Sequence, residues 1–220
     1  MSLFTATTRS IAFVLASTVI LGTAPTADAA EKYVKLVAGF GDLDDGGTLE
    51  VDDPRFSSTA DASYDLGIRS GLAFGWRFDD RFALELEYLY STNDFDAAVF
   101  SDGQRFEDGN YASVVISANA YTFFRRGESV RPYVGAGLGW VQEVDVDFER
   151  GDEEISFQTD DFGFQAMAGL LWDVNDRWSL DLQARYLVVD GLEMEAEEGA
   201  GTVVADYRPL SLFVGLGYRF

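Results

Sequence analysis

Large apolar residues alternate with small or polar residues along most of the chain after residue 30. In the stretch 65–78 (DLGIRSGLAFGWRF), the even positions are apolar apart from Ser70, whereas the odd positions from 67 on carry glycine, arginine or alanine. Successive side chains of a strand point to opposite faces, so this period of two predicts a β-strand. The same period predicts eight strands, at residues 33–41, 65–78, 81–90, 112–124, 132–140, 162–172, 178–186 and 208–220.

The connections between these strands alternate in length. Short ones lie at residues 79–80, 125–129 and 173–177, and long polar ones at 42–65, 91–110, 143–161 and 188–206. An even number of strands with short turns at one end and long loops at the other is typical of a transmembrane β-barrel. Closure is required because lipid offers no hydrogen-bond partner to an open sheet edge. We therefore predict an all-β fold, an eight-stranded antiparallel up-and-down transmembrane β-barrel with short periplasmic turns and four long acidic extracellular loops.

Aromatic residues support a membrane location for the apolar face. Six of them are predicted to lie near strand ends on the outward phase, where amphipathic rings favour the headgroup level: Trp76, Tyr88, Trp140, Trp172, Trp178 and Tyr186. A soluble β-sandwich would show the same alternation, with its apolar faces packed together, and is the alternative fold. The barrel is favoured by the aromatic residues near the strand ends, by the alternation of short and long connections, and by the N-terminal segment.

The N-terminal residues 1–29 have the features of a cleavable signal peptide. Arg9 precedes the apolar run 11–21, which is too short to span a bilayer as a helix. Ala27 and Ala29 then form the small-x-small pattern that signal peptidase accepts, so we expect cleavage after Ala29. The mature, exported barrel domain would comprise residues 30–220.

Charge is distributed very unevenly. The chain has 38 Asp and Glu against 16 Lys and Arg, a formal net charge of −22, and the four long connections hold 28 acidic and 3 basic residues. Such a surface repels phosphate backbones, so we expect no nucleic-acid partner. The acidic surface is suited to binding divalent cations, to forming ion bridges to lipopolysaccharide phosphates, or to attracting cationic ligands. A purely solvating role is also consistent with this charge.

One acidic stretch has partial metal-site spacing. In 42–53 (DLDDGGTLEVDD), Asp42, Asp44 and Asp53 occupy positions 1, 3 and 12 of an EF-hand-like loop, a candidate Ca²⁺ or other divalent-cation site. Gly46 stands at position 5, aspartate replaces the usual glutamate at position 12, and no helices flank the loop. Apart from this candidate ion, we expect no cofactor.

The inward phase carries charged residues. Because an eight-stranded barrel is just wide enough for side chains to fill, we expect ion pairs in the lumen among Arg69, Glu85, Glu87, Asp181 and Arg185. The inward glycines, such as Gly75 and Gly137, would leave room for long partners. A narrow or gated ion path is the alternative use of the same residues.

Enzymatic activity is not expected. The chain contains no histidine and no cysteine, which excludes the histidine-dependent machinery of barrel lipases and omptin-like proteases and any thiolate chemistry. Glu85 and Glu87 could form an acid/base pair, but they share the lumen face with Arg69 and Arg185, and no cleft is implied.

The strands "GAGLGW" and "VGLGYRF", with Leu216, Tyr218 and Phe220 at alternate positions, resemble the OmpA/OmpX-type small outer-membrane β-barrels of Gram-negative bacteria. The resemblance implies that Leu216, Tyr218 and Phe220 form the signal read by the barrel-assembly machinery. It also implies an outer-membrane monomer in contact with lipid and lipopolysaccharide. No residue follows Phe220, so we do not expect the peptidoglycan-binding domain of OmpA. The predicted function is a non-enzymatic structural or surface-interaction role through the acidic loops, and the alternative is a porin-like narrow pore for small solutes or ions.

Overall fold

Eight long strands form the wall of the barrel. The computed structural model describes residues 30–42, 48–53, 56–100, 105–106, 110–125, 127–150, 153–196 and 202–220, and the predicted signal peptide lies outside them. The wall strands are β1 (Glu31–Asp42), β4 (Gly67–Phe78), β5 (Phe82–Phe100), β7 (Asn110–Phe123), β8 (Val130–Arg150), β9 (Glu153–Asp173), β10 (Trp178–Ala196) and β12 (Leu210–Arg219). In the described part of the chain, no helix is long and apolar enough to cross a membrane.

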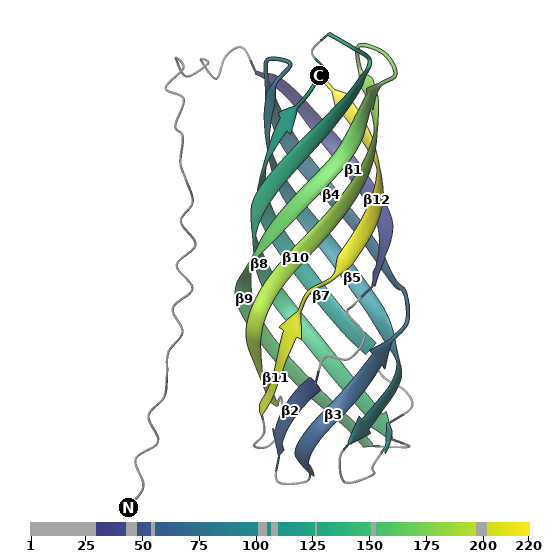
Figure 1. Cartoon of the computed structure of the whole chain (residues 1–220), viewed down its shortest axis with the longest axis vertical. Coiled ribbons are helices and arrows are strands. Elements are labelled where there is room, and N and C mark those ends of the chain that lie inside the picture. The colour runs from purple at the N-terminus through teal and green to yellow at the C-terminus, as the bar shows by residue number, and fades with distance from the viewer. Residues whose placement is uncertain are drawn as a thin grey trace, which may run out of the picture.

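Each wall strand pairs antiparallel with the next one along the chain, and the last pairs with the first. Leu36 of β1 lies opposite Leu216 of β12 on one side and Leu72 of β4 on the other. β12 pairs in turn with β10, which closes the ring (Figure 1). The predicted eight-stranded up-and-down barrel is confirmed, and its closure satisfies the backbone groups that lipid would leave unpaired.

The two phases of each strand face different surroundings, as predicted. Leu36, Leu72, Leu86 and Leu182 point outward and are 52–61% exposed. The inward residues between them are almost fully buried. A continuous apolar outer surface of this kind is stable in acyl chains rather than in water. Five of the six predicted girdle aromatics are 37–50% exposed on this surface: Tyr88, Trp140, Trp172, Trp178 and Tyr186.

Two of the three short connections are tight turns whose turn residues hydrogen-bond to the backbone. Asp79 adopts a positive φ of 57° and accepts a hydrogen bond from the backbone N–H of Arg81 at 2.7 Å. Asn175 accepts hydrogen bonds from the backbone N–H groups of Arg177 and Trp178, both at 2.9 Å. Side chains of this kind stabilise turns by replacing backbone partners. The predicted short turns are confirmed, and all lie at the end of the barrel where β12 finishes (Figure 1).

The prediction that the long connections are loops is wrong for much of their length. β5, β8, β9 and β10 continue far beyond the apolar band, and additional strands form at β2 (Thr48–Asp53), β3 (Phe56–Tyr64), β6 (Arg105–Phe106) and β11 (Thr202–Tyr207). β11, β2, β3 and β5 pair in that order and prolong the wall (Figure 1). The strands continue because the alternation of apolar and polar residues persists in stretches such as EVDVDF (143–148). The two strands of a hairpin also satisfy each other's backbone hydrogen bonds, in water as well as in lipid.

Candidate functional site

Three tyrosines reach into the lumen from positions opposite glycines. Tyr33 pairs with Gly75, Tyr121 with Gly135 and Tyr133 with Gly169 on the neighbouring strand. A Cβ at Gly75 would lie 2.1 Å from Cζ of Tyr33, so no larger residue fits beneath that ring without displacing it. The predicted role of inward glycines as room for long partners is confirmed at these positions.

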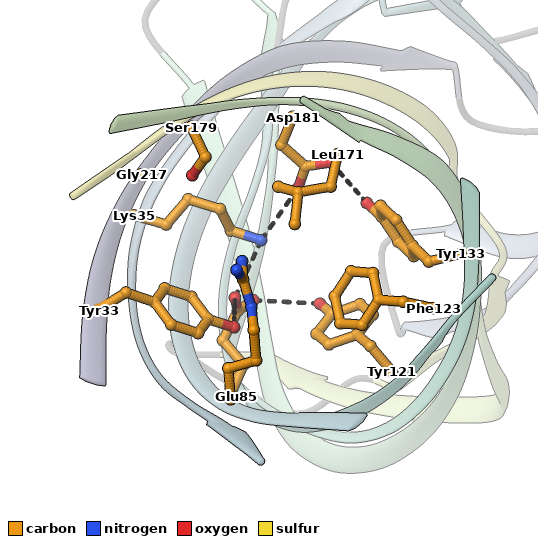
Figure 2. A pocket seen from close by; sticks show the side chains of 11 residues that line it. Tyr33, Lys35, Glu85, Tyr121, Phe123, Tyr133, Leu171, Ser179, Asp181 and Gly217 are labelled. Atoms are coloured by element: carbon orange, nitrogen blue, oxygen red, sulfur yellow. Dashed lines mark hydrogen bonds and ion pairs between the residues drawn. The ribbon is translucent and has the colours of Figure 1, made fainter. Parts of the chain in front are cut away.

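The three hydroxyls meet a charged cluster, which we call the lysine network: Tyr33, Lys35, Glu85, Tyr121, Tyr133 and Asp181 (Figure 2). Lys35 Nζ lies 3.0 Å from Glu85 Oε2 and 3.2 Å from Asp181 Oδ2. Tyr33 and Tyr121 each donate to Glu85 at 3.0 Å, and Tyr133 donates to Asp181 at 2.8 Å. Because every member is at most 8% exposed, these bonds act with little screening by water.

A second ion pair adjoins this network. Arg185 donates to both carboxylate oxygens of Glu87, one of them at 2.9 Å. It also donates to Gln183 Oε1 at 2.7 and 3.1 Å, and its guanidinium lies 4.7 Å from the ring centre of Phe213. Arg185 and Glu87, both among the residues expected to form ion pairs in the lumen, thus pair in the bidentate geometry that makes such pairs strong.

Arg69 differs from the other predicted members of the ion-pair set. It is 1% exposed and donates from Nη1 to the carbonyl of Gly41 at 3.2 Å and to Asn93 Oδ1 at 3.4 Å. Its Nη2 has no hydrogen-bond partner. Arg69 lies in the lumen as predicted, but its described hydrogen bonds go to neutral oxygens rather than to Glu85, Glu87 or Asp181.

The lumen ends, on the short-turn side, in an arginine cluster that the sequence did not single out. Arg77, Arg131 and Arg219 converge on Asp173, with Arg77 at 3.6 Å, Arg219 at 3.3 Å and Arg131 in a short hydrogen bond. The ring of Phe123 lies 5.6 Å from the guanidinium of Arg77 and 5.4 Å from that of Arg131. Asp173 thus joins three cations across the barrel mouth, and the more exposed carboxylates of Glu31 and Asp80 also pair with them.

Little space remains between these groups. A cavity of about 20 Å³ lies among the lysine network, Arg77, Phe123 and Leu171. That volume accommodates roughly one water molecule and no organic solute. The lumen around the lysine network is therefore a packed and hydrogen-bonded interior.

A group of buried apolar side chains faces the lumen next to the ion pairs, most of them on the long-hairpin side. We call it the apolar collar, formed by Val37, Leu89, Val115, Val141, Leu187 and Phe213, all 0–5% exposed. Direct cross-strand partners link Leu89 to Val115 and Val115 to Val141. The sequence-based interpretation of the lumen as polar missed this layer. The signal for it is a local loss of alternation, as in SVVIS (113–117) and YLVVD (186–190), where both phases are apolar.

The candidate metal site and the assembly signal, both expected from the sequence, stay predictions. Asp42 ends β1 with an exposed side chain, Asp44 lies outside the described residues, and Asp53 ends β2. Residues 48–53 are an extended strand, which departs from the compact EF-hand loop, and the described side chains contain no group of three carboxylates suited to a metal ion. In the predicted assembly signal, Leu216 and Phe220 are exposed on the outer face and Tyr218 packs on Trp178 with ring centres 4.9 Å apart.

Known structures share this architecture. The outer membrane protein OprG of Pseudomonas aeruginosa superposes with a TM-score of 0.66 at 16% identity, over 87% of this chain and 96% of that one. Neisserial surface protein A superposes with a TM-score of 0.54 at 17% identity, over 86% and 97%. At such identities the likeness shows the fold alone.

Sequence relatives and a family model define the family. Uncharacterized proteins of Brucella abortus and Brucella suis are each 32% identical over 169 residues, which cover 66% of this chain and 56% of the relative. The match thus spans just over half the length of these curated relatives. A model described as the outer membrane protein beta-barrel domain matches residues 13–220. Together with the closed barrel and its apolar outer surface, this match shows that the chain belongs to the family of outer membrane β-barrel domain proteins.

Proposed function

We propose that this protein is a non-enzymatic, non-conducting barrel that holds an acidic, strand-built rim at the cell surface, where the rim binds cationic partners or divalent ions. The observation that carries the proposal is the packed lumen. Inward side chains from all eight wall strands fill it with ion pairs, tyrosine hydroxyls and apolar groups, and the cavity beside the lysine network has room for about one water.

The long hairpins support the surface role. The four connections at their end carry 28 acidic and 3 basic residues, and much of their backbone is paired as β-structure rather than left as free loop. In small barrels of this kind the longer connections face outward. Paired strands hold charges at fixed spacing, so they bind cations at a smaller entropic cost than an unstructured segment. The name of Neisserial surface protein A places that structural relative at a surface as well.

The proposal predicts that the refolded protein does not conduct. In planar bilayers, current at moderate voltage should stay at the level of bilayers without protein, because the packed side chains leave an ion no open path. Regular unit openings that scale with salt concentration would overturn this part of the proposal and favour the narrow pore.

The surface role is tested by shortening one hairpin in register. Phe148 of β8 pairs with Ile155 of β9, so residues 149–154 can be replaced by an Asn-Gly turn while the wall below is kept. The replacement removes four acidic residues and one arginine. Binding of a fluorescent oligolysine should weaken, and the parent's binding should fall as ionic strength rises.

The matched control keeps the hairpin length and changes its charge. Glu149, Asp152, Glu153 and Glu154 become glutamine or asparagine, so the neutral hairpin and the shortened one should bind equally weakly. Calcium should raise the melting temperature of the parent more than that of either variant if divalent ions use this rim. Oligolysine binding that is equal in all three proteins would contradict the surface role without bearing on conduction.

A further inference from the structure

Along two wall strands the apolar collar lies between two polar parts of the lumen, which we call the polar compartments. Along β5 the inward residues run Glu87, Leu89 and Ser91, and along β7 they run Ser117, Val115 and Ser113, all buried at 5% exposure or less. A polar group therefore stands on each side of the collar residue in both strands. The short-turn side holds the lysine network and the Arg185–Glu87 pair, and the long-hairpin side holds Arg69 and the hydrogen bond of Ser113 to Tyr207.

Glycines face several collar side chains and leave them room. A Cβ at Gly71 would lie 3.0 Å from Cδ1 of Leu89 and 3.1 Å from Cγ2 of Val37. A Cβ at Gly139, in β8, would lie 3.0 Å from Cγ1 of Val115 and 3.9 Å from Cδ1 of Leu187. Side chains from β7 and β10 thus approach one another over the intervening strands, where glycine leaves them room.

We propose that this collar is a hydrophobic seal, and that it blocks ions, protons and water more effectively than the ion pairs do. The inference rests on the non-conducting function proposed above and names the layer responsible for it. In the polar compartments an ion or water can exchange partners with carboxylates, hydroxyls and amides. At the collar it loses every partner, and burying an uncompensated polar or charged group in such surroundings is strongly unfavourable. Narrow apolar constrictions block channels by the same exclusion of water.

The experiment compares leakage through three refolded proteins in liposomes that contain a pH-sensitive dye. The collar variant carries Leu89→Ser and Leu187→Ser, which shorten the layer from β5 and β10 and supply hydroxyls to water. The pair variant carries Arg185→Gln and Glu87→Gln, which remove both charges of the buried pair and keep polar side chains. Circular dichroism and heat-modifiable mobility on gels confirm that each protein is folded, and Leu89→Ala with Leu187→Ala replaces the serine variant if that one does not fold.

The collar variant should pass protons and potassium about tenfold faster than the parent or more, the factor that a barrier lowered by roughly 1.4 kcal/mol gives. The pair variant should remain as tight as the parent. A control, Met167→Ala, shortens a buried apolar side chain near Tyr121 instead of at the collar and should also remain tight.

The outcomes separate the two proposals. Leakage through the parent itself would overturn the non-conducting function. If the parent does not leak, two results would overturn the seal and leave the non-conducting function standing. One is that the folded collar variants do not leak either. The other is that the pair variant leaks as fast as the collar variant.

Discussion

The buried pair of Arg185 and Glu87 offers the sharpest test of what holds the barrel interior together. Arg185→Ala would leave Glu87, whose side chain is 0% exposed, without its bidentate partner. Within the lysine network and the adjoining pair, Lys35 would then stand as one cation against three carboxylates, those of Glu85, Glu87 and Asp181. The contact of the guanidinium with the ring of Phe213 would be lost as well.

The size of the effect follows from burial rather than from the number of contacts. Breaking a buried ion pair by removing one partner typically costs about 3–5 kcal/mol, because the remaining charge is uncompensated. For a urea dependence of about 2 kcal/mol per molar, that loss lowers the unfolding midpoint by roughly 1.5–2.5 M. The intact pair itself contributes much less, since both charges are desolvated on folding.

The assay is urea unfolding of the refolded protein in detergent micelles or lipid vesicles, followed by tryptophan fluorescence. The double variant Arg185→Met and Glu87→Leu should recover much of the midpoint, because well-packed apolar residues replace buried pairs at small cost. Arg125→Ala is the surface control, since its pair with Glu128 joins two side chains that are at least 60% exposed. A midpoint for Arg185→Ala equal to that of the parent would refute the reasoning and indicate that water reaches Glu87.

Three further predictions concern other parts of the wall. Asp173→Asn should lower the unfolding midpoint more than Asp80→Asn, because Asp173 holds three guanidiniums whereas Asp80 is 59% exposed and pairs with one. Gly75→Val should cost about 1–3 kcal/mol in the same assay, because the added atoms overlap the ring of Tyr33. Deletion of Phe220 should reduce the amount of protein recovered in outer-membrane fractions without reducing export, and unchanged outer-membrane levels at modest expression would contradict its role in assembly.

The transmembrane wall was predictable because one physical constraint governs every residue in it. Lipid on one side and a packed lumen on the other impose a period of two, so the strand positions and the outward phase follow from the sequence, as Leu86 and Leu182 illustrate. Outside the membrane both faces of a strand can be polar. The alternation weakens there, and segments such as Glu153–Asp161 of β9 were therefore predicted to be loop.

Within the lumen, residue type was predictable and pairing was not. Five charged residues were expected inside and are buried there, but their partners depend on strand tilt and rotamer rather than on spacing along the chain. Lys35 pairs with Glu85 and Asp181, which come from strands on either side of it around the ring. Glu87 pairs with Arg185 instead. Asp173 was assigned to a turn, yet it ends β9 and holds the arginine cluster.

The collar shows why an apolar residue in the lumen phase is informative. In a barrel wall, outward apolar residues contact the lipid acyl chains and need no further explanation. An inward apolar residue, by contrast, removes a polar partner from a narrow interior. Val115 and Leu187 each break the alternation in this direction, and the breaks recur on β1, β5, β8 and β12 among residues that are at most 5% exposed. A single break of this kind is not distinguishable from chance variation in a sequence. The register aligns Val37, Leu89, Val115 and Val141, through Gly71, into one row around the wall, and a row that spans five strands is better explained as a barrier than as accidental packing.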